Sequence, residues 1–176
     1  MFKTPMKILV SVILFGIMSG FFYFSSTIFG KTTPAPDIIS PIWINSEPLK
    51  MEDLRGKVVM VEFWTFGCWN CRNIEPYVKE WHDQYAKQGL VVIAVHSPEF
   101  KYEYDVKKVK EYVQKHHISY AVPIDNEFLN WRLYRNRYWP TRYLIDKKGN
   151  IQYTKIGEGS YEETEKTIQQ LLAEPT

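Results

Sequence analysis

The only two cysteines of this 176-residue chain stand at positions 68 and 71, between a strand-like run and a helix-like run. Residues 58–64, VVMVEFW, form a nearly unbroken apolar run that predicts a strand covered on both faces in a parallel sheet. After Cys71, apolar side chains recur at helical spacing. The C-x-x-C motif therefore joins a buried strand to the first turn of a helix.

The position of Cys68 at a helix start favours redox chemistry over a structural role. Unpaired backbone N–H groups and the positive end of the helix dipole stabilise a thiolate there, which lowers the pKa of the thiol. A crosslink between cysteines so close in sequence removes little entropy from the unfolded chain, so a structural disulfide is disfavoured. We expect Cys68 to attack a substrate disulfide and Cys71 to resolve the mixed disulfide.

Residues 1–30 form a separate unit. Lys3 and Lys7 precede an uncharged stretch, residues 8–28. As a helix this stretch would be about 31 Å long, close to the hydrocarbon thickness of a bilayer. Bulky aromatic residues fill positions 21–24, where signal-peptide cleavage requires small side chains. The sequence favours an uncleaved signal anchor over a cleaved signal peptide, with the lysines in the cytoplasm and the rest of the chain outside.

The charge balance beyond the anchor excludes a basic surface for nucleic acid. Lys3 and Lys7 account for the formal net charge of +2, because the remaining basic residues are matched by the 20 acidic ones. No nucleic-acid partner is therefore expected. Residues 31–41 contain three prolines and predict a short stiff linker that leads into a domain over residues 42–176.

The pattern of residues 42–176 predicts alternating strands and helices around one mixed sheet. Strands are predicted over residues 42–45, 58–64, 90–95, 120–124, 141–146 and 151–155, the last two as a hairpin. Helices are predicted from Cys71 to Gly89, over residues 105–116, from an Asn126 cap to residue 134, and after a capping box of Ser160 and Glu163. The first helix should bury Ile74, Tyr77, Val78, Trp81 and Tyr85. The charged and aromatic run 102–110 is interpreted as a solvated helix face.

This arrangement resembles the thioredoxin fold, and within it the membrane-tethered TlpA/ResA-type redoxins and the thioredoxin-like domain of DipZ-type proteins. The resemblance covers about residues 42–172 and rests on a strand followed by W-x-x-x-C-x-x-C and a helix. Matching positions are Trp64, Glu62 for the family's buried acid, Pro76 for its helix-kinking proline and Pro140 for its cis-proline. It implies a thioredoxin-like three-layer α/β sandwich with a mixed central sheet, preceded by one N-terminal transmembrane helix.

Two positions depart from the family. Gly67 stands where an aromatic residue commonly precedes the first cysteine. Between the cysteines stand Trp69 and Asn70, instead of the Gly-Pro of reducing thioredoxins or the Pro-His of strong oxidants.

Glu62 is a candidate proton carrier, because burial in an apolar strand raises the pKa of a carboxyl group. It could then accept the proton that Cys71 loses as it attacks. The alternative is an outward-pointing side chain on a half-exposed strand. His96 ends the neighbouring strand at the same sheet edge, where a simple polar role is favoured over an effect on the thiolate.

Aromatic residues and a proline are candidates for substrate binding. The resemblance implies a cis Trp139–Pro140 bond, which would free the backbone of Trp139 to pair with an extended substrate strand. An ordinary trans proline is the alternative. Trp64 and Trp69 flank the cysteines and are expected to form an apolar docking surface, although Trp64 would serve equally as core filling.

These features predict an extracytoplasmic, membrane-anchored thiol:disulfide oxidoreductase that acts on protein thiols and disulfides. The catalytic domain is expected in the periplasm or at the outer face of the cell membrane. The Cys68–Cys71 pair is its redox centre, and no further cofactor or metal is expected. The resemblance implies a membrane electron donor of the CcdA/DsbD type, with cytochrome c maturation or general disulfide repair as plausible duties.

Two alternatives stay open. A thiol peroxidase of the AhpC/TSA-redoxin type is indicated by T-x-x-C at Thr65 to Cys68, although Val61 stands where those enzymes have a proline. A Sco-like copper chaperone would use two thiolates and a histidine as ligands. That family spaces its cysteines C-x-x-x-C and places its histidine far downstream, unlike this chain.

Overall fold

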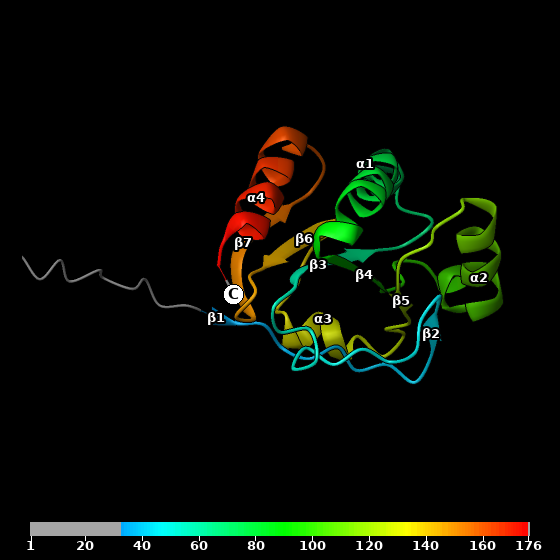
Figure 1. Cartoon of the computed structure of the whole chain (residues 1–176). Helices are drawn as coiled ribbons and strands as arrows, with labels where there is room; N and C mark the ends of the chain where they lie inside the picture. Colours follow the sequence, from blue (N-terminus) through cyan, green and yellow to red (C-terminus); the bar gives the residue numbers. More distant parts are fainter. Residues whose placement is uncertain (1–32, 176) are drawn as a thin grey trace, which may run out of the picture. The chain divides into compact units, whose positions relative to one another are not determined.

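A five-stranded mixed sheet organises the computed structural model, which describes residues 33–175 (Figure 1). Across the sheet the strands are β1 (Thr33–Pro34), β7 (Asn150–Ile156), β6 (Thr141–Ile145), β3 (Val58–Trp64) and β4 (Leu90–His96). β3 and β4 are parallel, and the other neighbours are antiparallel. The predicted mixed sheet and its C-terminal hairpin are therefore confirmed.

Helices cover both faces of this sheet, as a layered α/β sandwich requires. α1 (Trp69–Tyr85) and α4 (Tyr161–Ala173) lie on one face, and α3 (Leu129–Leu133) lies on the other (Figure 1). α1 is followed by a 3₁₀ turn, η1 (Ala86–Gln88), and ends before Gly89, whose φ of 109° suits a residue without a side chain. The expected anchor helix falls outside the described residues. Between residues 33 and 175 no helix has the length and apolarity needed to cross a bilayer.

The alternation of side chains along β3 decides which residues face the dithiol helix. All seven residues of β3 are buried, because helices pack on both sides of it. Met60 and Trp64 belong to the core under α1, whereas Val61 and Phe63 belong to the core on the α3 side. Since successive side chains point to opposite faces of a strand, Glu62 faces α1 together with Met60 and Trp64.

The segment between β4 and β6 adds a flanking unit to the sheet. It contains a 3₁₀ turn, η2 (Lys101–Tyr104), then α2 (Val106–Lys115) and β5 (Val122–Pro123). β5 pairs with β2 (Trp43–Ile44), and isolated parallel bridges join Ala121 and Ile124 to β4. The predicted helix over 105–116 and the strands near 42–45 and 120–124 are thus present, the strands shorter than predicted.

Two predicted helix caps are wrong. The N-cap position of α3 is Phe128, not Asn126. The carboxylate of Asp125 accepts hydrogen bonds from the first-turn backbone N–H groups of Asn130 (2.9 Å) and Trp131 (3.0 Å). Ser160 precedes α4 in a left-handed conformation, with φ of 52°, and its side chain makes no capping bond. The capping box of Ser160 and Glu163 therefore does not form.

Three burial expectations also need correction. Tyr77 is 37% exposed and stacks on Tyr161 of α4, with ring centroids 3.8 Å apart, instead of entering the core. Part of the predicted linker packs onto the domain, since β1 pairs with β7 and Ile38 is buried. Within the run interpreted as a solvated face, Glu103 is completely buried.

Candidate active site

The two thiols lie where β3 passes into α1. Cys68 is the N-cap of α1, and its Sγ accepts a hydrogen bond from the backbone N–H of Cys71 at 3.3 Å. Both cysteines are free thiols. Cys68 is 8% exposed and Cys71 is 4% exposed, so the first thiol is the more accessible one. This is the helix-start position that the sequence predicts.

The environment separates the pKa values of the two thiols. The pKa of Cys68 is lowered, first by a hydrogen bond from the Cys71 thiol and further by backbone N–H groups, against an opposing effect of burial. Burial raises the pKa of Cys71, and its hydrogen bond to Cys68 raises it further. The pair therefore places the more acidic thiol at the helix N-terminus and the less acidic thiol behind it.

Glu62 lies beneath α1 and is buried, 4% exposed, which confirms the inward orientation. Burial raises its pKa to about 8, and the positive charge of Arg142 on β6 partly opposes that rise. Arg142 is the direct cross-strand partner of Glu62 in the β3–β6 register. Arg142 is not identifiable as a site residue from the sequence alone, since only the strand pairing brings the two charges together.

An open pocket of about 370 Å³ adjoins the exposed side of Cys68, and we call it the dithiol groove. Its lining comprises Gly67, Cys68, Trp69, Asn70, Glu99, Phe100 and Trp139. Trp69 is 69% exposed, so its indole is available to a partner. Glu99 and Phe100 are not identifiable as site residues from the sequence alone, because they reach the site only through the path of the chain after β4.

The Trp139–Pro140 peptide bond is cis, as the resemblance implied. The indole Nε1 of Trp139 donates a hydrogen bond to the carbonyl oxygen of Ser97 at 2.9 Å, which fixes the ring beside the groove. Within residues 33–175 the backbone N–H and C=O of Trp139 have no hydrogen-bond partner. Pro140 itself is buried at the start of β6.

Two residues near the dithiol are core groups. Trp64 is only 5% exposed and its Nε1 donates to the carbonyl oxygen of Ala94 at 3.0 Å, so of the two roles considered for Trp64 the structure supports core filling and not docking. His96 is fully buried and its Nε2 lies 3.2 Å from the Thr65 hydroxyl. Burial lowers the pKa of His96 to about 3, so the ring is neutral at physiological pH.

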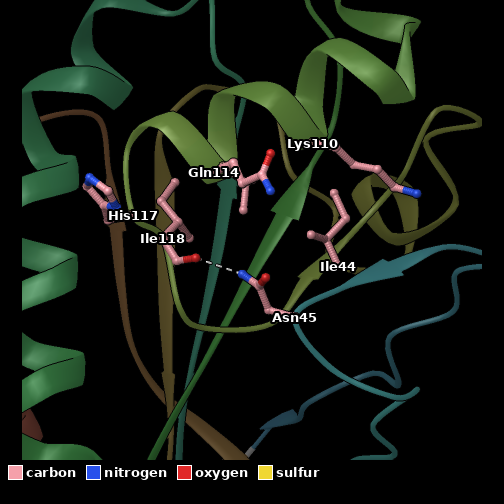
Figure 2. A pocket seen from close by; sticks show the side chains of 7 residues that line it. Ile44, Asn45, Lys110, Gln114, His117 and Ile118 are labelled. Atoms are coloured by element: carbon pink, nitrogen blue, oxygen red, sulfur yellow. Dashed lines mark hydrogen bonds between the residues drawn. The ribbon is translucent and has the colours of Figure 1, made fainter.

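A second pocket, of about 430 Å³, lies between β2 and α2 (Figure 2). Ile44 and Asn45 face Lys110 and Gln114 across it, and the Asn45 amide donates to the carbonyl oxygen of Ile118 at 2.8 Å (Figure 2). It shares no lining residue with the dithiol groove. In the described part of the chain no group of three or more His, Cys, Asp or Glu side chains is placed to hold a metal ion.

Comparisons with known proteins agree with this geometry. The model of the AhpC/TSA family matches residues 32–154. Protein DipZ of Mycobacterium tuberculosis is 42% identical over 133 residues, which cover 74% of this chain but only 19% of DipZ. The chain thus spans about a fifth of the length of that relative.

A second relative is matched over nearly its whole length. Thiol-disulfide oxidoreductase YkuV of Bacillus subtilis is 30% identical over 142 residues, which cover 80% of this chain and 95% of YkuV. Among solved structures, a thiol-disulfide isomerase from Corynebacterium glutamicum superposes with a TM-score of 0.71 at 28% identity, covering 80% of this chain and 98% of the isomerase.

Proposed function

The chain belongs to the AhpC/TSA family and is a thiol:disulfide oxidoreductase of its thioredoxin-like, TlpA/ResA-type branch, and from this premise we propose that it reduces protein disulfides outside the cytoplasm while anchored to a membrane. The observation that carries the proposal is the asymmetry of the dithiol. Cys68 opens onto the groove with a lowered pKa, whereas Cys71 lies behind it with a raised one.

In the proposed cycle the Cys68 thiolate attacks one sulfur of a substrate disulfide. The substrate S–S bond breaks, a Cys68–substrate mixed disulfide forms, and the other substrate sulfur leaves as a thiolate. Cys71 then loses its proton and attacks Cys68 Sγ, which releases the second substrate thiolate. Two electrons pass to the substrate, and the protein is left with a Cys68–Cys71 disulfide.

Glu62 is the proposed acceptor for the proton of Cys71. Its carboxyl group faces α1 from β3, and its negative charge is among the causes of the raised pKa of Cys71. With a pKa of about 8, about a tenth of the Glu62 carboxyl groups are ionised at pH 7. The resolving step should therefore accelerate as the pH rises toward 8.

Substrate binding is proposed for the groove and for the peptide next to it. The unpaired N–H and C=O of Trp139 suit a β-type pairing with an extended substrate segment. The exposed indole of Trp69, which also lines the groove, would pack on that segment. Pro140 would keep the Trp139 backbone at the groove through the cis bond.

The proposed location rests on the N-terminal sequence. Lys3 and Lys7 followed by an uncharged stretch suit an anchor with the catalytic domain outside the cytoplasm. There the oxidised protein needs a source of electrons, and a membrane protein of the CcdA/DsbD type is the proposed donor. Cytochrome c maturation or general disulfide repair are the duties that such an arrangement would serve.

The test is catalysed reduction of insulin disulfides by the full chain in detergent, with dithiothreitol as electron source. Wild-type protein should accelerate the reaction, and Cys68→Ser should abolish the acceleration. Full activity of Cys68→Ser would overturn the proposal. Equilibration with glutathione gives the reduction potential and hence the favoured direction of electron flow.

A thiol peroxidase of the AhpC/TSA-redoxin type is the second candidate, because the AhpC/TSA family model matches residues 32–154 and Thr65 supplies T-x-x-C. The Thr65 hydroxyl lies within hydrogen-bond distance of His96 Nε2 at 3.2 Å, and both residues are buried. The reduced protein can be tested with hydrogen peroxide: consumption faster than that by free dithiothreitol alone would favour this candidate over disulfide reduction.

A further inference from the structure

The dithiol groove has two sides that come from distant parts of the chain. Residues 67–70, around the first cysteine, and Glu99 with Phe100 are the two parts that we call its sides, and Trp139 completes the lining. Phe100 is 47% exposed and stacks nearly parallel on Tyr102, with ring centroids 5.8 Å apart. The spacing of the two sides decides whether a polypeptide can lie between them and reach Cys68.

One buried carboxyl group joins the two sides. Glu103 of η2 is completely buried, and its Oε1 accepts a hydrogen bond from the backbone N–H of Gly67 at 2.8 Å. Its Oε2 accepts from the backbone N–H groups of Glu99 at 2.6 Å and of Phe100 at 2.8 Å. A buried acidic side chain is tolerated when its oxygens are paired in this way, and bonds to an ionised acceptor are the stronger kind.

The close approach of Glu103 also explains the glycine before the first cysteine. A Cβ atom on Gly67 would collide with Glu103 Oε1 and with the Tyr102 hydroxyl. The aromatic residue common at this position in the family therefore cannot fit while Glu103 holds its place. Gly67 and Glu103 thus form one arrangement, in which a missing side chain makes room for a carboxyl group.

We propose that Glu103 is a positioning residue that holds the two sides of the dithiol groove at the spacing an extended polypeptide needs. The inference rests on the proposed function, since it concerns how a protein disulfide reaches Cys68. Without the three hydrogen bonds, Glu99 and Phe100 separate from Gly67, and a polypeptide loses one of its two contact surfaces. A small disulfide needs only Cys68 and is spared.

The test compares Glu103→Gln with wild type in the reduction of insulin and of 5,5′-dithiobis(2-nitrobenzoic acid). Gln keeps the shape but places an NH₂ donor where an acceptor is required, so at least one bond is lost. We expect kcat/KM for insulin to fall about tenfold, as for a mispositioned substrate, and the rate with the small disulfide to stay within about twofold. Glu111→Gln, at an exposed position on α2, is the matched control and should leave both rates unchanged.

Equal losses with both substrates, or no loss with either, would overturn the inference. Phe100→Ala provides a second variant that leaves the Glu103 carboxyl group in place, and it should show the same selective loss. If Glu103→Gln does not fold, absence of a selective loss in Phe100→Ala overturns the inference.

Amide hydrogen exchange separates this inference from the proposed function. Glu103→Gln should speed exchange at one or more of the amides of Gly67, Glu99 and Phe100, and unchanged rates at all three would contradict the positioning role. A wild-type protein that reacts with the small disulfide but never reduces insulin would contradict the proposed function instead.

Discussion

Arg142 on β6 stands directly across from Glu62 on β3, and both side chains are buried, at 0% and 4% exposure. The guanidinium group donates one hydrogen bond, to the carbonyl oxygen of Gly159 at 2.8 Å, and lies 5.9 Å from the ring centre of Trp81. Within the described residues it makes no direct ion pair with Glu62. Its charge nevertheless acts through a poorly screened interior and offsets part of the effect of burial on the Glu62 pKa.

Arg142→Met should raise the pKa of Glu62 further, because it removes the positive charge that favours the carboxylate. The pH midpoint of the resolving step should move up by about one unit. Stopped flow with 5,5′-dithiobis(2-nitrobenzoic acid) measures this step, because the second thionitrobenzoate is released when Cys71 attacks Cys68 Sγ. Groups that also act on Glu62 are Glu75 and Cys71 of α1, the N-cap residue Cys68, and Tyr120, and all of them are retained in the variant. Arg132→Met, at an exposed position on α3, is the control and should keep the wild-type midpoint. An unchanged midpoint in Arg142→Met would contradict the role of Arg142.

Glu62→Gln should change how stability depends on pH. The folded-state pKa of Glu62, about 8, lies above its ordinary value of 4.5, so the folded reduced protein holds a proton that the unfolded chain releases between those values. Glu62 therefore stabilises the fold below about pH 4.5, and that stability is lost as the pH rises through 8. The lost free energy of unfolding is on the order of 5 kcal/mol.

Urea unfolding of the reduced wild type and of Glu62→Gln at pH 5 and pH 9 measures this difference. The wild type should lose more stability over the interval than the variant does. Glu163→Gln, at an exposed position on α4, should behave like wild type. Parallel pH dependence in wild type and Glu62→Gln would contradict the raised pKa.

The strand–dithiol–helix unit was predictable because its signals are local. A run of apolar residues, two cysteines and helical periodicity after them fix β3, α1 and the place of Cys68 without knowledge of the rest of the chain. Glu62 was predictable for the same reason, since a single acid inside an apolar strand is visible in sequence. The C-terminal hairpin followed from its Lys-Lys-Gly-Asn turn.

Arg142 and Glu103 were not predictable because their roles depend on distant partners. Arg142 pairs with a strand far earlier in the chain, and nothing within β6 marks it as the neighbour of an acid. Glu103 lies among charged and aromatic residues that suggested a solvated helix face. It is buried because the 3₁₀ turn η2 directs its carboxyl group toward three backbone N–H groups, one of them beside the first cysteine.

Glu99→Gln should make Cys68 more reactive at low pH. The Cys71 thiol is the main cause of the lowered pKa of Cys68, whereas the negative charge of Glu99 opposes it. Because Glu99 is exposed, its removal should speed alkylation of Cys68 by iodoacetamide at pH 6 only about twofold. Glu111→Gln is the control for loss of one surface charge, and slower alkylation of Glu99→Gln would contradict the assignment.

His96→Gln should reduce the acid sensitivity of the fold. The folded-state pKa of His96, about 3, lies below its ordinary value of 6.5, so the unfolded chain binds a proton that the folded protein excludes. The free energy of unfolding of the wild type should therefore fall as the pH drops below 6.5. The contribution of His96 to this loss at pH 4 is about 3 kcal/mol. Urea unfolding of the wild type and of His96→Gln at pH 7 and pH 4 measures the effect.

The exposed His117 provides the matched control, and His117→Gln should retain the wild-type loss of stability. An equally large loss in His96→Gln would show that other groups cause the acid sensitivity.

Trapping of the mixed disulfide tests the central claim most directly. Cys71→Ser removes the resolving thiol, so a protein disulfide that Cys68 attacks should stay covalently attached. Incubation of reduced Cys71→Ser with insulin, followed by acid quench and mass spectrometry of tryptic peptides, should show an insulin chain bonded to Cys68. No adduct with Cys71→Ser, or an equal adduct at Cys71 in Cys68→Ser, would contradict the assignment of Cys68 as the attacking thiol.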